Sequence, residues 1–333
     1  MNDNITRRQF LGIATAATSA LAGSNLLSAC RKKQDDKVED DYHALAEPPV
    51  GKMTCRESNT THDKVSLLAF GMMRLPTTKK VTKTEGNEET VEEEIDQETL
   101  NTMVDYAIEH GVNYFDTAPV YCRGLSERAT GIALSRHPRE KYLVATKMSN
   151  FAPETRSYEA SMEMFDNSLK ELQVDHIDFY LAHSVGRSIE EWNERFIDNG
   201  VLERLVQLRE EGKIRNLGFS FHGKKEVFDH ILAYHEKCHW DFVMIQMNYL
   251  DWSFAEEMSD SNVNASYLYG ELQKRGIQCN IMEPLLGGRL ANVPHFVARA
   301  MKRRRPERSI ASWAFRYAGT REGVLTVLSG MNC

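Results

Sequence analysis

The segment Val112-Asn113-Tyr114-Phe115-Asp116 is a short apolar run that ends in a carboxylate. The same form recurs at 142–147, which ends in Lys147, and at 177–183, which ends in His183. Runs of this length and composition predict buried β-strands. Polar side chains at the carboxyl ends of successive parallel strands converge on one face of a barrel. We therefore expect Asp116, Lys147 and His183 to form one site, together with Tyr121, which follows Asp116 closely.

This set of side chains can deliver a proton to a carbonyl oxygen. A free phenol has a pKa of about 10, and we expect the ammonium of Lys147 to lower that of Tyr121. Asp116 would hold Lys147 by charge pairing, and His183 would orient and polarise the carbonyl. Each residue alone also fits a structural role. Asp116 could cap a loop, Tyr121 could be part of a wall, Lys147 could be a surface charge, and His183 could end a strand with its hydrogen bonds satisfied.

Apolar runs and helical patterns alternate along the rest of the chain. The expected strands are 65–70, 112–116, 141–146, 177–182, 214–220, 241–247, 277–282 and 324–328. The expected helices are 97–110, 125–136, 157–172, 200–211, 224–235, 266–275 and 309–318. This alternation predicts an α/β fold with a parallel sheet, closed into a (β/α)8 TIM barrel. A doubly wound open sheet is the alternative, although no G-x-G-x-x-G follows the first strand.

Several connections carry their own predictions. We expect 55–64 to form a hairpin that plugs the bottom of the barrel. Three long connections, 77–96, 184–199 and 249–265, follow strands and should lie as loops on the active face. The last two contain three aromatic side chains, which either form an apolar substrate wall or fold the loops onto the barrel: Trp192, Trp252 and Phe254.

The N-terminal region has the features of an export signal. Thr6-Arg7-Arg8-Gln9-Phe10-Leu11 is a twin-arginine pattern, and Leu27-Ser28-Ala29-Cys30 resembles a bacterial lipobox. We expect residues 1–30 to be this signal, with lipid attached at Cys30, and 31–50 to be a polar tether. A transmembrane anchor is the alternative, but polar residues interrupt the run, which falls short of the ~20 apolar residues of a span. The expected location is the periplasm or cell envelope.

Composition narrows the classes of partner. The net charge of −7 argues against nucleic acid. Acidic residues concentrate in 35–47 and in 85–98, which we interpret as solvated segments. The six cysteines form no C-x-x-C motif, and the twin-arginine route carries proteins folded in the reducing cytoplasm, so we expect mostly free thiols.

An ordered set of motifs resembles one known family. The segments are Phe115-Asp116-Thr117-Ala118-Pro119-Val120-Tyr121 with Leu125-Ser126-Glu127, then Ala145-Thr146-Lys147, Tyr180-Leu181-Ala182-His183, Leu217-Gly218-Phe219-Ser220, Ile245-Gln246-Met247-Asn248 and Glu283-Pro284-Leu285-Leu286-Gly287-Gly288. Through them, residues 51–333 resemble the aldo/keto reductase family. The resemblance implies a TIM barrel that binds NADP(H), or NAD(H), and reduces a small carbonyl substrate. The family's catalytic tetrad corresponds to Asp116, Tyr121, Lys147 and His183.

The same resemblance implies a set of cofactor contacts. Gln246 and the Ser220 region would hold the nicotinamide amide, with Gly71 and Met72 close to the ring. The backbone of the segment after the seventh strand would cradle the pyrophosphate, with Pro284, Leu285, Gly287 and Gly288 in contact. Met282 stands where many members stack an aromatic side chain on the nicotinamide, and a methionine can also pack against a ring.

Three further interpretations compete with this one. His235-Glu236-Lys237-Cys238-His239 matches the zinc protease pattern H-E-x-x-H, but it runs from a helix end toward the sixth strand, at the barrel bottom and without a third ligand. We expect no metal there. The basic run 302–308 could bind an acidic partner or phosphate, and a solvated face is the simpler interpretation. A cofactor-retaining redox sensor or partner-docking barrel is the alternative function.

The C-terminal end suggests one more expectation. A barrel of this family has a covering helix after its eighth strand, whereas this sequence stops soon after 324–328. We expect the barrel to lack that helix and the chain to be cut short. An iron–sulfur segment is expected only if the native chain continues past Cys333.

Overall fold

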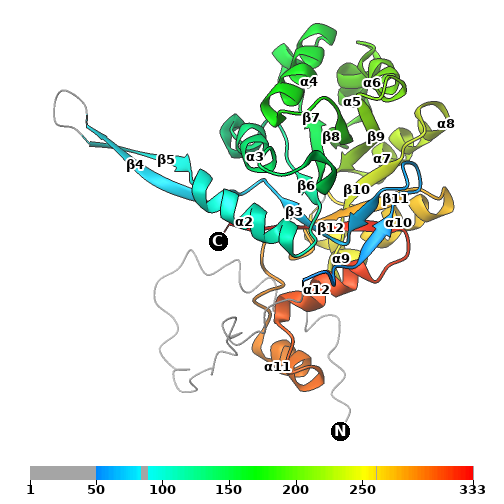
Figure 1. Cartoon of the computed structure of the whole chain (residues 1–333). Coiled ribbons are helices and arrows are strands. Elements are labelled where there is room, and N and C mark those ends of the chain that lie inside the picture. Colours follow the sequence, from blue (N-terminus) through cyan, green and yellow to red (C-terminus); the bar gives the residue numbers. More distant parts are fainter. Residues whose placement is uncertain (1–49, 84–88, 260, 333) are drawn as a thin grey trace, which may run out of the picture. The chain divides into compact units, whose positions relative to one another are not determined.

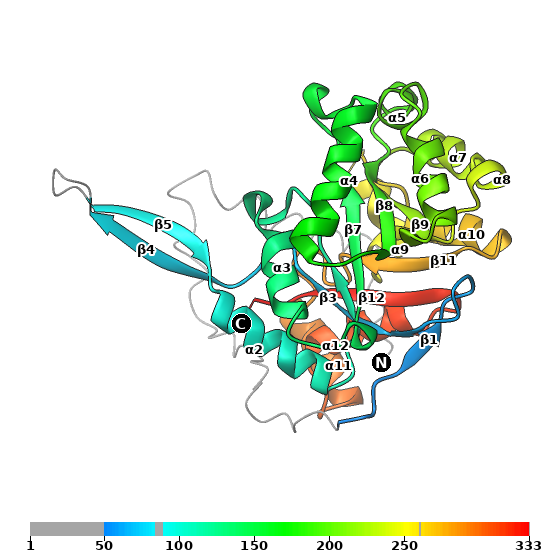
Figure 2. The same cartoon turned by 45° about the horizontal axis from the view of Figure 1, so that its top comes forward.

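Eight parallel strands form a closed barrel, which confirms the predicted (β/α)8 architecture (Figure 1, Figure 2). The computed structural model describes residues 50–83, 89–259 and 261–332, so the expected signal, the lipobox and nearly all of the tether lie outside the described residues. Around the barrel, the strands follow chain order: β3 (Leu68–Gly71), β6 (Tyr114–Asp116), β7 (Leu143–Met148), β8 (Ile177–Val185), β9 (Ile214–Phe221), β10 (Phe242–Gln246), β11 (Gln278–Met282) and β12 (Val324–Gly330).

Helices surround the barrel and follow the predicted order. All seven expected helices form, with ends within two residues of the prediction: α2 (Gln97–Glu109), α3 (Ser126–Leu134), α4 (Tyr158–Leu172), α6 (Val201–Glu210), α7 (Lys225–Ala233), α10 (Ala265–Lys274) and α12 (Ile310–Gly319). Their starts are stabilised by side-chain caps, since Asp96, Ser157 and Ser309 accept hydrogen bonds from amides of the first turn. Two helices that the sequence pattern missed are α8 (His235–Cys238) and α11 (His295–Arg304).

The first predicted strand, 65–70, is in fact two strands. Its start belongs to β2 (Lys64–Ser66), which pairs antiparallel with β1 (Cys55–Glu57), and only β3 enters the barrel. The predicted hairpin at the barrel bottom is confirmed, because Asn59 N donates to Gln278 Oε1 at 2.8 Å, at the start of β11. Arg56 anchors the hairpin further by donating to the carbonyl of Arg321 at 2.7 Å.

The three long connections are more ordered than expected. The first, 77–96, was expected as a loop, but it is a hairpin of β4 (Thr77–Lys83) and β5 (Glu89–Ile95) that projects from the barrel (Figure 1). In its described part, Lys79 lies opposite Glu93. Both strands contain β-branched residues, which favour strand pairing.

The other two connections contain short helices. Residues 184–199 include α5 (Ile189–Trp192) and a π-helical turn η5 (Asn193–Ile197), and 249–265 include α9 (Asp251–Met258). Trp192 is fully buried against Phe196, and Trp252 contacts the ring of Tyr317 at a centroid distance of 6.2 Å. Trp192 therefore folds its connection onto the barrel, and a substrate wall that includes Trp252 and Phe254 remains a prediction.

The interior of the barrel is packed by aromatic side chains from successive strands. The ring centroids of Tyr114 and Phe179 lie 4.9 Å apart, and those of Phe179 and Phe242 lie 5.1 Å apart. Gly218 is required here, because a Cβ at this position would meet the carbonyl oxygen of Phe242 at 2.3 Å. This solid interior confines any ligand to the ends of the barrel.

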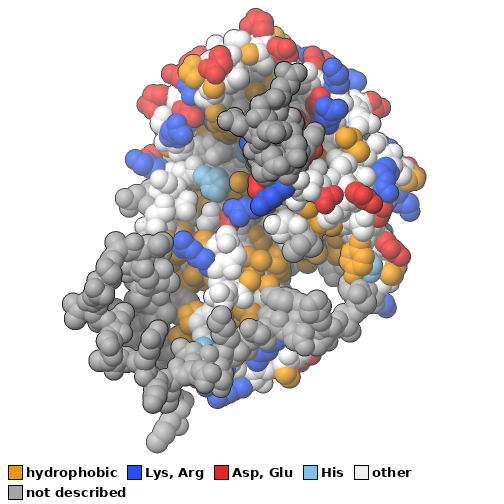
Figure 3. Space-filling model, turned by 90° about the vertical axis from the view of Figure 1, so that its left-hand side faces the viewer, with side chains coloured by type: hydrophobic (Ala, Val, Ile, Leu, Met, Phe, Trp, Pro, Cys, Tyr) orange, Lys and Arg blue, Asp and Glu red, His pale blue; other side chains and the backbone are white. Residues whose placement is uncertain are grey.

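The described part of the chain has a charged surface (Figure 3), and its cysteines are unpaired. The arginines of the predicted basic run, Arg303 to Arg305, are exposed at the end of α11, as expected of a solvated face. Figure 3 faces the side from which β4 and β5 project, and shows charged side chains along the upper rim with hydrophobic ones exposed near the centre.

The four described cysteines, which are Cys55, Cys122, Cys238 and Cys279, are free thiols. Within the described ranges, no helix is both long enough and apolar enough to cross a bilayer.

A buried carboxylate organises the amino-terminal ends of three strands. Asp178 of β8 accepts hydrogen bonds from Arg139 at 2.6 Å, from Arg215 at 3.1 Å and from the amide of Val144 at 2.8 Å. Burial opposes its charge, but these partners and His176 hold the pKa of Asp178 below its ordinary value. The network thus joins β7, β8 and β9 at the barrel bottom.

We predict that Asp178→Asn destabilises the fold by about 3 kcal/mol at pH 7, because it leaves two buried arginine contacts without their carboxylate. A depressed native pKa adds stability that is full above the ordinary aspartate pKa of about 3.9 and is lost as the pH falls through the native value. Urea unfolding at pH 7 and at about pH 3 should therefore show a smaller acid-induced loss in the variant. The exposed Asp166 provides the control Asp166→Asn, and an unchanged acid dependence in Asp178→Asn would contradict the assignment.

Candidate active site

Neighbouring strand ends bring the four predicted residues together at one end of the barrel. Asp116 ends β6, Lys147 lies near the end of β7 and His183 near the end of β8, and these three strands are adjacent. Tyr121 begins the 3-10 turn η2 (Tyr121–Gly124), which follows β6. In that turn Cys122 and Arg123 adopt left-handed backbone conformations, with φ of 50° and 57°. The tight turn returns the Tyr121 ring over the strand ends.

Lys147 and Asp116 form a buried ion pair at the centre of the site. Nζ of Lys147 donates to Oδ1 of Asp116 and to the carbonyl oxygen of Thr117, each at 2.6 Å. Burial opposes the charge of Lys147, but Asp116 and Tyr121 together raise its pKa above the ordinary value. Burial raises the pKa of Asp116, and Lys147 acts against that rise. The pair keeps a permanent cation in a site that excludes water.

The phenol of Tyr121 lies directly beside this cation. Nζ of Lys147 is 4.7 Å from the centroid of the Tyr121 ring, which is a cation–π distance. The sequence predicted that Lys147 lowers the pKa of Tyr121, and the ammonium does act in that direction, but the net shift is upward. Burial raises the pKa of the phenol, and Lys147 only offsets part of that rise. Tyr121 therefore holds its proton at rest.

His183 completes the site as a neutral imidazole. Its ring centroid lies 5.7 Å from that of Tyr121, in an edge-to-face arrangement. Nδ1 is 2.6 Å from the hydroxyl oxygen of Ser149, and the His183 carbonyl accepts from Arg195 at 2.8 Å. Burial, with the charges of Lys147 and Arg195, holds the pKa of His183 well below its ordinary value. Ser149 follows Lys147 by two residues, so the strand period could have indicated it.

The predicted cofactor residues at the strand ends occupy different environments. Gly71 ends β3 beside Asp116. Met72 is fully buried in the core, and its amide donates to the Asp116 carbonyl at 2.8 Å. Ser220 is buried on β9 and accepts from the Ser184 amide at 2.7 Å. Gln246 and Met282 lie opposite each other at the ends of β10 and β11. That these five residues contact the cofactor remains a prediction.

The segment after β11 has an unusual backbone. Glu283 and Leu286 have φ of 53° and 49°, and the following Gly287 and Gly288 are also left-handed. A Cβ added to either glycine would meet nothing within 4 Å, so this backbone is open to a ligand. However, the Gly287 amide donates to Oε2 of Glu283 at 2.7 Å. A carboxylate of the chain itself thus occupies one amide of the expected pyrophosphate cradle. Contact of Pro284 and Leu285 with the cofactor also remains a prediction.

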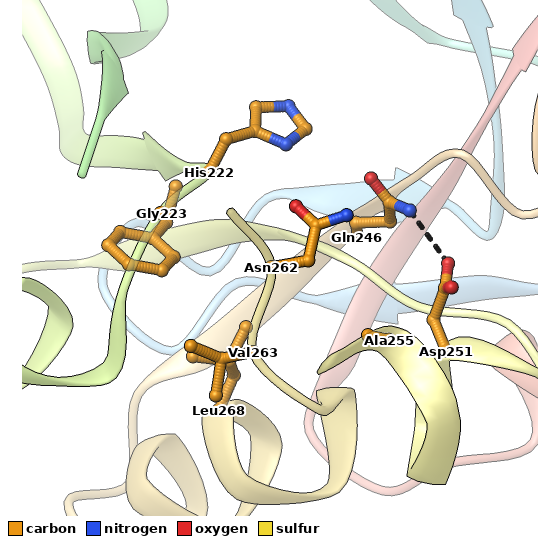
Figure 4. A pocket seen from close by; sticks show the side chains of 9 residues that line it. His222, Gly223, Gln246, Asp251, Ala255, Asn262, Val263 and Leu268 are labelled. Carbon is orange, nitrogen blue, oxygen red and sulfur yellow. Dashed lines mark hydrogen bonds between the residues drawn. The ribbon is translucent and has the colours of Figure 1, made fainter. Parts of the chain in front are cut away.

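Gln246 belongs to a small pocket beside the site. The pocket is an open hollow of about 240 Å³, a volume that includes solvent at its mouth, and its walls include Phe221, His222, Asn262 and Val263 (Figure 4). It does not include the tetrad. The amide of Gln246 donates to Asp251 at 2.7 Å. The sequence pattern missed Asp251, because no periodicity marks a residue on the first turn of a helix inside a connection.

The H-E-x-x-H segment lies elsewhere. His235 begins α8, His239 follows it with a left-handed φ of 50°, and their ring centroids are 5.9 Å apart. Arg209 donates to the carbonyl of His239 at 2.7 Å. The segment precedes β10, so it lies toward the amino ends of the strands, away from the tetrad. Among the described residues, no group of three potential metal ligands comes together.

Comparisons with known proteins agree with this geometry. The model of the aldo/keto reductase family matches residues 67–332. An aldo-keto reductase of Mycolicibacterium smegmatis is 34% identical over 127 residues, which cover 37% of this chain and 41% of that protein. The chain thus spans less than half the length of the curated relatives that it matches.

Solved structures share the architecture. The holo form of an aldo-keto reductase from Bacillus halodurans matches with a TM-score of 0.62 at 26% identity, covering 84% of this chain and 86% of that one. An aldo-keto reductase from Klebsiella pneumoniae, solved in complex with NADPH, matches with a TM-score of 0.60 at 20% identity, covering 84% and 86%. The second likeness shows the fold alone.

We predict that His183 stays neutral well below the ordinary histidine pKa of about 6.5. A nitrogen-detected NMR titration of the imidazole should show no protonation at about pH 6. Because Lys147 is the main charge that lowers this pKa after burial, Lys147→Met should raise it. Free imidazole provides the reference in a parallel titration. Protonation of His183 at the ordinary histidine pKa of about 6.5 would contradict the assignment.

Proposed function

The chain belongs to the aldo/keto reductase family, and we propose that it reduces an aldehyde or ketone to an alcohol with Tyr121 as proton donor. The observation that carries this proposal is the position of the Lys147 ammonium, 2.6 Å from Asp116 and 4.7 Å from the centre of the Tyr121 ring. A fixed cation beside a protonated phenol is the arrangement that general acid catalysis at a carbonyl oxygen requires.

We propose NADP(H), or NAD(H), as the cofactor. When bound, the nicotinamide would supply the hydride that reaches the carbonyl carbon. The residues present fit such a group, because the glycines at 287 and 288 leave an open backbone and Gln246 places an amide at the end of β10. The Klebsiella pneumoniae neighbour, solved with NADPH, supports the same cofactor class.

The roles of the tetrad follow from its electrostatics. Tyr121 holds its proton at rest and gives it to the carbonyl oxygen as charge develops there. Lys147 stabilises the phenolate that remains, and Asp116 keeps Lys147 charged despite burial. A neutral His183 can donate from Nε2 to the substrate when the Ser149 hydroxyl donates to Nδ1. Solvent then returns a proton to Tyr121.

We also propose export and lipid attachment. The twin-arginine pattern at residues 6–11 and the lipobox-like segment ending in Cys30 support it. A reductase in the periplasm or cell envelope would have no pool of free NADPH. It would therefore retain its cofactor or receive electrons from a redox partner.

We predict that Tyr121→Phe lowers kcat for carbonyl reduction about 100- to 10 000-fold, the usual contribution of a general acid. The phenyl ring keeps the shape of the site, so cofactor affinity should change little in a fluorescence titration. The exposed Tyr158 provides the matched control Tyr158→Phe, which should keep full turnover. Wild-type turnover by Tyr121→Phe would exclude this residue as the donor.

We predict that Cys30→Ala moves the protein from the membrane fraction to the soluble or unprocessed fraction of the expressing cell, because the acyl attachment point is removed. The matched control is Cys55→Ala, which removes an exposed free thiol and should leave the distribution unchanged. Mass spectrometry of the mature N-terminus checks the result. A mature wild-type chain without acyl mass would reject the lipid anchor.

A further inference from the structure

Asp251 is a buried carboxylate that the proposed chemistry does not use. It is 2% exposed, at the first position of α9. One of its oxygens, Oδ2, accepts two amide hydrogen bonds, from Nε2 of Gln246 at 2.7 Å and from Nδ2 of Asn248 at 2.5 Å. Because both donors use the same oxygen, that oxygen carries no proton. Burial raises the pKa of Asp251, and these two amide hydrogen bonds and the charge of Arg289 act against that rise.

The carboxylate is held rigidly by the turn that precedes it. Oδ1 of Asn248 accepts from the amides of Leu250 and Asp251 at 3.0 Å and 2.9 Å. The Asn248 amide also donates to the carbonyl of Glu283 at 3.1 Å, which joins the ends of β10 and β11. Asn248 therefore fixes the backbone at the start of α9 and also donates to the Asp251 side chain.

This arrangement decides which way the Gln246 amide faces. A carboxylate only accepts hydrogen bonds, so the nitrogen of Gln246 must point at Asp251. The oxygen Oε1 is then directed away from Asp251, as Figure 4 shows, and none of the described residues donates to it. Without Asp251, a glutamine amide could present either atom, since its two orientations differ little in shape.

We propose that Asp251 is a positioning residue that locks Gln246 with its oxygen toward the cleft, so that the site selects a cofactor ring bearing an N–H donor. The inference rests on the proposed function, because it assumes that a nicotinamide dinucleotide binds beside Gln246. The nicotinamide carboxamide offers such a donor. A ring that carries an acetyl group in its place has the same size and carbonyl, but it has no N–H.

The test compares equilibrium binding of NADPH with that of its reduced 3-acetylpyridine analogue, by fluorescence titration without substrate. Wild-type protein should prefer NADPH by about five- to tenfold, the usual effect of one hydrogen bond. In Asp251→Ala the Gln246 amide can flip, so the preference should fall below about twofold. Asp251→Leu keeps the side-chain shape but removes both acceptor oxygens, and it should show the same loss. Rescue by Asp251→Glu is not expected, because the longer side chain cannot fit the Asn248 turn.

Controls distinguish a failure of the positioning role of Asp251 from a failure of the proposed function. Asp229→Asn alters a carboxylate bonded to Tyr267 on the neighbouring helix face and should keep the wild-type ratio. Thermal melts establish which variants fold, and Asp251→Leu serves if Asp251→Ala does not. An unchanged ratio in a folded Asp251 variant would overturn the positioning role, as would equal wild-type affinity for both compounds. Failure of the wild-type protein to bind either compound would instead count against the proposed function.

Discussion

The ion pair between Lys147 and Asp116 is the interaction on which the site depends. It joins the carboxyl ends of two adjacent barrel strands, and its cation lies against the ring of Tyr121. An unpaired ammonium at this depth would lose its proton, because burial disfavours the charged form. The carboxylate prevents this loss. Burial lowers the pKa of His183, and the charge of Lys147 lowers it further.

The two ends of the barrel use buried charge in different ways. At the amino ends of the strands, Asp178 is surrounded by donors that satisfy it, and the hairpin β1–β2 covers the surface. That arrangement stabilises the fold and leaves nothing to react. At the carboxyl ends, Tyr121 and His183 lie beside the buried cation of Lys147, and burial shifts the pKa of both side chains. Shifted pKa values of this kind are typical of sites that transfer protons.

Second-layer contacts fix the groups that would meet a ligand. Ser149 holds one nitrogen of His183, and Asp251 holds the amide of Gln246. Glu283 uses the Gly287 amide, so a phosphate that binds this backbone must compete with a carboxylate. Each contact removes one orientation that the side chain or loop would otherwise sample. The site is thus preorganised by hydrogen bonds and by the packing of Tyr114, Phe179 and Phe242 beneath it.

The sequence by itself determined the barrel and the convergence of Asp116, Lys147 and His183, because apolar runs that end in polar residues place those residues at one end of a parallel sheet. Only the tertiary structure decided the direction of the Tyr121 pKa, since burial depends on what packs around the ring and not on the neighbouring charge alone. It also decided the split of the first strand, the hairpin β4–β5 and the role of Asp251. These features arise from contacts between segments distant in the chain or from turns without periodicity. Local sequence patterns carry no record of such contacts.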